Sequence, residues 1–209
     1  SHGRIAAAAV EAAREDVAGL IGAEAREIVF TSGATESNNI AVKGAARFLK
    51  DRRDHVVTCV TEHKCVLESV ERLEREGFAV TWLPVGRDGL VDLAALEAAI
   101  TERTALVTIM AVNNEIGVIQ PLADIGKLAH AKGALFHTDA AQAAVDRSPR
   151  SPRQYARISR SKSTALVISR GRKNAFVARA VTLSSSAPPS RATTFDQSSF
   201  TSDSCLMTR

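Results

Sequence analysis

The sequence predicts an α/β fold in which a mainly parallel sheet is flanked by helices. Two observations lead to this prediction. Short apolar segments of strand length alternate with helical segments of about a dozen residues, the pattern of repeated βαβ units. In addition, residues 104–112 are almost wholly apolar, as expected of a strand that is buried on both faces of a sheet.

The first part of the chain is expected to hold two helices and a strand. Residues 3–21 are rich in Ala, and their larger apolar side chains recur on one side, which predicts an amphipathic helix. Residues 28–31 are β-branched or aromatic and predict a short buried strand that stops at Ser32-Gly33. Helical spacing then continues from Ile40 to Phe48.

The elements that follow alternate in type. Glycines are suited to ending helices, and Pro121 is suited to starting one. The predicted strands cover residues 55–60, 78–83, 104–112 and 134–138. The predicted helices cover residues 65–76, 93–100 and 121–132.

Four polar segments directly follow predicted strands. They are Thr31–Thr35, Thr61–Lys64, Asn113–Gly117 and Asp139–Gln142. Ligands of parallel sheets bind beyond the carboxyl ends of the strands. We therefore expect these four segments to converge on one face of the molecule.

The first of these segments predicts an anion site. A strand that breaks at Gly33 and continues into a helix leaves backbone N–H groups without partners, and the helix dipole favours a phosphate there. Taken alone, the same segment is also typical of an ordinary capped turn.

Asp139 and His63 suggest what the phosphate belongs to. A carboxylate that directly follows an apolar strand is costly to bury without a cation. A protonated pyridine nitrogen would provide that cation, and the ring would then act as an electron sink. His63 would stack on the ring, and Asn114 and Gln142 would donate to its oxygen, so the predicted ligand is pyridoxal phosphate.

Each of these residues also has a plainer explanation when it is taken singly. His63 is compatible with a surface histidine, Asp139 with a helix cap, and Asn114 with a turn. His63 together with Cys59 and Cys65 matches no strong zinc spacing, so no metal site is expected.

Four motifs carry a resemblance to a known family. They are FTSGATESNN (30–39), TEHKCVLES (61–69), VNNEIGVIQP (112–121) and HTDAAQAA (137–144). With these motifs, residues 2–144 resemble the cysteine desulfurases of the class V aminotransferase family, most closely those that supply sulfur for iron–sulfur cluster assembly. The resemblance implies part of the large domain of the type I pyridoxal-phosphate-dependent transferase fold.

The resemblance also implies residue roles and partners. The cofactor-binding residues would be Ala34, Thr35, His63, Asn114, Asp139 and Gln142, of which His63 would also be catalytic. The implied reaction takes sulfur from L-cysteine, leaving L-alanine and a persulfide on a mobile cysteine. The implied partners are a second copy of the chain and an iron–sulfur scaffold or another sulfur-acceptor protein.

The resemblance ends at about residue 145. The family's Schiff-base lysine, in a Ser-x-His-Lys segment, does not appear, and neither does its late catalytic cysteine; Lys162 and Cys205 lack the required context. We therefore expect residues 1–145 to be a partial cofactor-binding domain and the chain as written to be inactive.

Residues 146–209 have a different composition. From residue 147 onward they contain ten Arg and two Lys but only two Asp, so the chain's net charge of +4 comes from this segment. We interpret it as a frameshifted and disordered tail. Codon degeneracy permits a one-base shift to convert residues 161–166 into Lys-Val-Tyr-Gly-Pro, which resembles the family sequence at its lysine.

Two other functions stay open. The chain could come from another class V enzyme, such as a selenocysteine lyase or an aminotransferase, or it could be a basic protein that binds nucleic acid through the tail. Among the possible partners of the chain, nucleic acid is the least expected.

Composition narrows the setting. The sequence contains no apolar run of membrane-spanning length, and its three separated cysteines imply no disulfide framework. We expect a protein of the bacterial cytoplasm, with the mitochondrial matrix as the alternative.

Overall fold

The computed structural model describes residues 2–21, 23–143, 164–170 and 176–182. Its centre is a four-stranded sheet with the order β2-β1-β3-β4, and each neighbouring pair is parallel. The strands are β1 (His55–Cys59), β2 (Ala79–Leu83), β3 (Thr104–Thr108) and β4 (Leu135–His137). The parallel sheet that the sequence predicts is confirmed.

Helices connect the strands, close to the predicted positions. They are α1 (His2–Ile21), α2 (Ala34–Leu49), α3 (Lys64–Arg75), α4 (Leu93–Ala99) and α5 (Leu122–Ala131), with a short 3-10 turn, η1 (Ala25–Glu27). Asp92 begins α4 by accepting hydrogen bonds from the N–H groups of Ala94 and Ala95. Gly77 and Gly133 follow α3 and α5 with φ of 91° and 69°, a conformation that favours glycine at helix ends.

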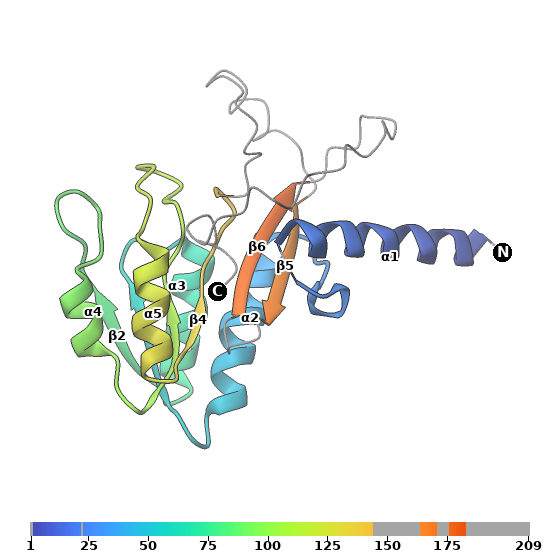
Figure 1. Cartoon of the computed structure of the whole chain (residues 1–209). Coiled ribbons are helices and arrows are strands. Elements are labelled where there is room, and N and C mark those ends of the chain that lie inside the picture. The colour runs from blue at the N-terminus through green and yellow to red at the C-terminus, as the bar shows by residue number, and fades with distance from the viewer. Residues whose placement is uncertain (1, 22, 144–163, 171–175, 183–209) are drawn as a thin grey trace.

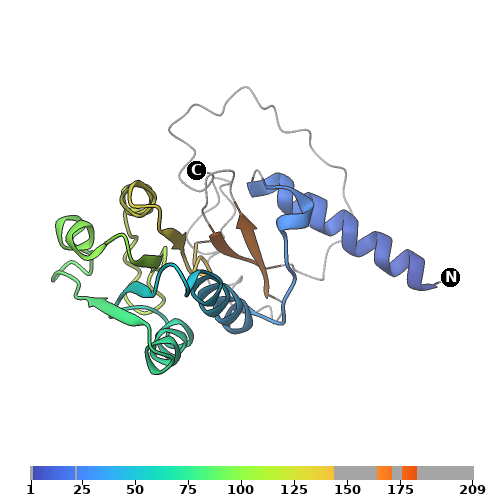
Figure 2. The same ribbon diagram turned by 90° about the horizontal axis from the view of Figure 1, so that it is seen from below.

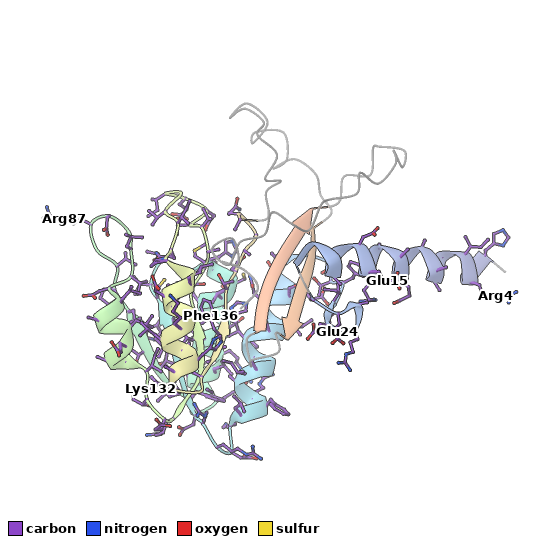
Figure 3. All side chains as sticks on the ribbon, viewed as in Figure 1. Arg4, Glu15, Glu24, Arg87, Lys132 and Phe136 are labelled. Carbon is purple, nitrogen blue, oxygen red and sulfur yellow. The ribbon has the colours of Figure 1, made fainter. Side chains whose placement is uncertain are left out.

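The helices cover the sheet on both faces (Figures 1 and 2). Alternate residues of each strand point to opposite faces, which divides the core in two. One cluster joins α4 and α5 to Val57, Val107 and Phe136. The other joins α2 and α3 to Val56, Leu106 and Leu135. Phe136, labelled in Figure 3, lies beneath α5, where its ring is 3.4 Å from the position that a Cβ atom would take on Gly126.

Helix α1 extends away from the rest of the molecule (Figure 1), and Arg4 lies near its outer end (Figure 3). Only the last part of the helix is packed: Val17 and Ala18 are buried against Ile28. None of the described helices is both long and apolar enough to cross a bilayer.

The strand predicted over residues 28–31 is wrong. The backbone of Ile28 is extended, with φ of −93° and ψ of 125°, but residues 28–31 pair with none of the strands that the structure describes. Two of its apolar side chains pack on α1 instead: Ile28 is buried beside Val17, and the centre of the Phe30 ring lies 4.9 Å from the guanidinium of Arg14. Burial against a helix therefore accounts for the pattern that suggested a strand.

Part of the basic tail has regular backbone structure. Strand β5 (Thr164–Arg170) pairs with β6 (Phe176–Thr182) in antiparallel fashion, and both lie beside α2. The Val, Ile and Phe content of these two segments favours strands, and the expectation of disorder for the tail stays a prediction. The other residues of 146–209, Lys162 and Cys205 among them, lie outside the described residues, so the boundary at 145 and the frameshift stay predictions.

Candidate active site

The candidate site lies where β1 and β3 end. These neighbouring strands lead into residues 60–63 and 109–121, and the chain places β2 on one side of β1 and β3 on the other. Such a change of direction in strand order is where parallel α/β sheets bind ligands beyond the strand ends. Residues 138–142, which follow β4, reach the same edge of the sheet.

Asp139 is the carboxylate that the sequence predicts for the site, and it is buried, with 4% of its surface exposed. Its Oδ2 accepts a hydrogen bond from Nδ2 of Asn38 at 2.7 Å, and its Oδ1 accepts one from the N–H of Ala141 at 2.9 Å. Among the described residues it forms no ion pair with an arginine or a lysine. A buried carboxylate held only by neutral donors is suited to a cationic ligand.

His63 lies next to Asp139, as predicted. It is the N-cap residue of α3, and its Nδ1 accepts a hydrogen bond from the N–H of Cys65 at 3.2 Å. The same nitrogen is 3.0 Å from Sγ of Cys65. Donor atoms of His63, Cys65 and Asp139 all lie within 4.8 Å of one another. The ring of His63 is exposed, so it lies between the buried carboxylate and the solvent.

The start of α2 has the features of the predicted phosphate site. Gly33 is the N-cap residue and supplies no capping side chain, so the N–H groups of Ala34 and Thr35 have no side-chain cap. The turn before it is held by Glu36, which accepts hydrogen bonds from the N–H and the hydroxyl of Ser32 at 2.6 and 2.7 Å. These bonds lower the pKa of Glu36.

A buried carboxyl group that the sequence did not single out, that of Glu62, connects the segments after β1 and β3 at the site. Oε1 of Glu62 accepts a hydrogen bond from the N–H of Met110, just beyond β3, and lies 3.6 Å from Sγ of Cys59. Burial raises the pKa of Glu62 to about 8, and the nearby charge of Asp139 adds to this effect. Glu62 thereby joins the turn that carries His63 to the end of the neighbouring strand.

Several buried polar atoms near Asp139 have no hydrogen-bond partner among the described residues. They are Oδ1 of Asn38, Oε2 of Glu62, Nε2 of His137 and Oγ1 of Thr138. Burial lowers the pKa of His137 to about 4, and its Nδ1 lies 2.7 Å from Oγ1 of Thr108. Because unpartnered buried polar groups are rare, their gathering here is typical of a site that a polar ligand completes. This observation fits a pyridine ring with polar substituents.

Asn114 and Gln142 are exposed, and no hydrogen bond connects either of them to Asp139 among the described residues. In the loop after β3 the preceding residue, Asn113, makes the contacts: its Nδ2 donates to the carbonyl of Thr61 at 2.9 Å. The roles of Asn114 and Gln142 therefore stay predictions.

Sequence reasoning missed Asn38, Glu62 and Cys65 as members of the site. Asn38 and Glu62 lie inside two of the quoted motifs, but no local pattern shows that their side chains are buried. A signal was present for Asn38, since it comes one helical turn after Ala34 and so faces the same way.

Comparison with known proteins agrees with this geometry. Residues 1–151 match the family model described as aminotransferase class-V. The chain belongs to this family. It is 63% identical over 134 residues to the probable mitochondrial cysteine desulfurase of Dictyostelium discoideum, and the matched segment covers 64% of this chain and 30% of the relative. It is 59% identical over 143 residues to the cysteine desulfurase of Homo sapiens (68% and 31%) and 58% identical over 142 residues to cysteine desulfurase IscS of Rickettsia bellii (68% and 35%).

Solved structures share this fold over about two thirds of the chain. DndA from Streptomyces lividans matches with a TM-score of 0.66 and 43% identity, over 68% of this chain and 40% of that one. SspA in complex with cysteine matches with a TM-score of 0.65 and 46% identity, over 68% and 41%. The chain thus spans about a third of the length of the curated relatives that it matches.

Proposed function

We propose that this chain carries the cofactor-binding part of a pyridoxal-phosphate-dependent cysteine desulfurase. The relatives support the reaction, since those named above are cysteine desulfurases at 58–63% identity. One observation carries the proposal. Asp139, which follows β4 in the chain, is buried next to His63 and has no cationic partner among the described residues.

The residues fit the cofactor at both of its ends. The N–H groups of Ala34 and Thr35 would bind the phosphate, because the start of α2 offers donors and the positive end of the helix dipole. Asp139 would accept a hydrogen bond from the protonated pyridine nitrogen and so keep the proton on that nitrogen, and His63 would cover one face of the ring. When bound, the cofactor supplies an electron sink for the carbon atoms attached to the substrate nitrogen.

The substrate and partners are proposed from the relatives. One solved relative is described in complex with cysteine, which supports L-cysteine as the substrate. The overall reaction converts L-cysteine and an enzyme thiol into L-alanine and an enzyme persulfide. We propose a homodimer that passes this sulfur to an iron–sulfur scaffold or another acceptor, in a bacterial cytoplasm or a mitochondrial matrix, since relatives include a mitochondrial protein and bacterial IscS proteins.

Because the family's lysine motif and late cysteine do not appear in the sequence, we propose that the 209-residue chain alone does not release alanine from L-cysteine. Alanine formation by the purified chain would refute this part of the proposal.

Cofactor binding is best tested with pyridoxamine 5′-phosphate. This form has an amine in place of the aldehyde, so it cannot react with surface lysines. We expect calorimetry to show binding by the full chain, weakened about tenfold or more in Asp139→Asn, because the neutral amide no longer pairs with the protonated ring.

Asp124→Asn is the matched control, since Asp124 is an exposed carboxylate that pairs with Lys127 at 3.0 Å. Pyridoxamine without its phosphate should bind more weakly than the phosphorylated form. Equal affinities of Asp139→Asn and the unaltered chain would overturn the proposed ring site.

A further inference from the structure

We propose that His63, Cys65 and Asp139 form a site for a thiophilic divalent cation, Zn²⁺ in the first place, when the cofactor is absent. Their donor atoms all lie within 4.8 Å of one another. Donor atoms that share one zinc ion, each at about 2.0–2.3 Å from it, lie roughly 3–4 Å apart. The three residues therefore need only small movements to bind a single ion.

The ligand types agree with this choice of metal. An imidazole nitrogen, a thiolate sulfur and a carboxylate oxygen are all common zinc ligands, and the thiolate disfavours Mg²⁺ and Ca²⁺. Three protein ligands leave the fourth tetrahedral position open. His63 is exposed while Cys65 and Asp139 are buried, so an ion can enter from the solvent past the imidazole.

The side chain of Asn38 is an independent indication that a ligand belongs here. It is fully buried, and its Nδ2 contacts both Oδ2 of Asp139 (2.7 Å) and Sγ of Cys65 (3.3 Å). Its Oδ1 has no partner among the described residues. A half-turn of this amide, whose oxygen and nitrogen ends have nearly the same shape, would bring the unpartnered oxygen toward the ion.

The charge around the cluster also favours a cation. The carboxyl group of Asp139 is buried and forms no ion pair with a lysine or an arginine among the described residues. A bound cation would offset the cost of burying the charge of Asp139.

The sequence expectation of no metal site considered only the spacing of His63, Cys59 and Cys65. In the structure Cys59 contacts Glu62 and is not part of the cluster. The third ligand is Asp139, which follows β4 on the other side of β3. Since Asp139 and His63 are also the residues proposed to hold the cofactor ring, metal and cofactor should exclude each other. That exclusion rests on the proposed function, whereas metal binding by itself does not.

The test uses Co²⁺ as a spectroscopic substitute for Zn²⁺. The full chain, carrying Cys205→Ser to remove the thiol outside the described residues, is titrated with Co²⁺ without cofactor. We expect a thiolate-to-cobalt charge-transfer band that saturates at one ion per chain and that Zn²⁺ abolishes. No such band in the folded chain would overturn the proposal.

Variants assign the ligands. Cys65→Ser should abolish the charge-transfer band, whereas Cys59→Ser, which removes the other buried thiol, should keep it. Asp139→Asn should weaken Co²⁺ binding about tenfold or more, and Asp124→Asn should leave it unchanged. A band that survives Cys65→Ser, or that Cys59→Ser removes equally, would contradict the assignment.

His63→Asn covers the case in which Cys65→Ser does not fold, as judged by circular dichroism. Asparagine keeps a capping acceptor for α3 but removes the imidazole. Unchanged Co²⁺ affinity in this variant would refute the site. Finally, pyridoxamine 5′-phosphate should raise the apparent dissociation constant of Co²⁺; binding of both together would refute the exclusion but leave the metal site standing.

Discussion

Nδ2 of Asn38 donates a hydrogen bond to Oδ2 of Asp139 at 2.7 Å, across 101 positions of the sequence. It connects the second turn of α2, which begins at the proposed phosphate site, to the carboxylate proposed for the pyridine nitrogen. A side-chain contact between a helix and the segment after β4 therefore connects the two ends of the proposed cofactor site.

Asn38→Ala should destabilise the chain by about 2 kcal/mol, because Asp139 loses a charge-assisted hydrogen bond in a buried setting. Affinity for pyridoxamine 5′-phosphate should fall as well, since the carboxylate is no longer oriented. Urea unfolding and calorimetry measure the two effects.

Asn39→Ala is the control for this substitution. Asn39 is the adjacent residue of α2, but its side chain bonds only within that helix: Nδ2 donates to the carbonyl of Thr35 and Oδ1 accepts from Lys43. If both alanine variants lose the same stability and affinity, the contact with Asp139 has no special role.

His63 should have two separable roles. As the N-cap residue of α3 it accepts the N–H of Cys65, so His63→Ala should cost about 1 kcal/mol of unfolding free energy. His63→Asn should restore that stability, because asparagine caps helices well. Both variants should bind pyridoxamine 5′-phosphate more weakly, since both lack the ring. Recovery of cofactor affinity in His63→Asn would show that His63 acts only as a cap.

Glu62 should make the chain less stable as pH rises from about 6.5 to about 8. The native state holds the proton of Glu62 up to about pH 8, whereas the unfolded chain releases it near 4.5. In this window the native state binds more protons than the unfolded state, so the free energy of unfolding falls with increasing pH. Urea unfolding in chelator-containing buffer measures the slope.

His137 works in the opposite sense at lower pH. Its pKa of about 4 lies below the ordinary 6.5, so between these pH values the unfolded chain binds a proton that the native state does not bind. The free energy of unfolding therefore falls as pH falls from 6.5 to about 4. Between about pH 4.5 and 6.5 the effects of the two groups on the free energy of unfolding offset each other.

Glu62→Gln keeps an acceptor for Met110 but cannot titrate, so it should flatten the dependence of unfolding free energy on pH above 6.5. A profile that keeps its slope in this variant assigns the effect to another group.

Leu106→Ala should destabilise the chain by about 2–5 kcal/mol, because this side chain of β3 is fully buried between the sheet and the α2–α3 layer. Phe48→Ala removes a larger side chain, but that side chain is 83% exposed, so its effect should stay within about 0.5 kcal/mol. Urea unfolding of both variants tests whether the sheet, rather than apolar content as such, carries stability. Comparable losses would contradict the layered core.

The sequence predicted the parallel sheet, its helices and the convergence of the segments that carry His63 and Asp139. Those features depend on local signals, such as apolar strands of fixed length, glycines after helices and polar residues at strand ends. The prediction for residues 28–31 was wrong because a short apolar segment is equally suited to packing on a helix, and only the tertiary structure shows that Ile28 contacts α1.

The local pattern of apolar and polar residues by itself determined the class of fold and the edge of the sheet at which the candidate site lies. Only the tertiary structure decided that Asn38, Glu62 and Cys65 join that site, because their contacts with Asp139, Met110 and each other cross from one element to another. Hydrogen bonding and burial between segments that are distant in sequence have no period along the chain. A sequence pattern therefore cannot show them, whereas close packing of the folded chain fixes them.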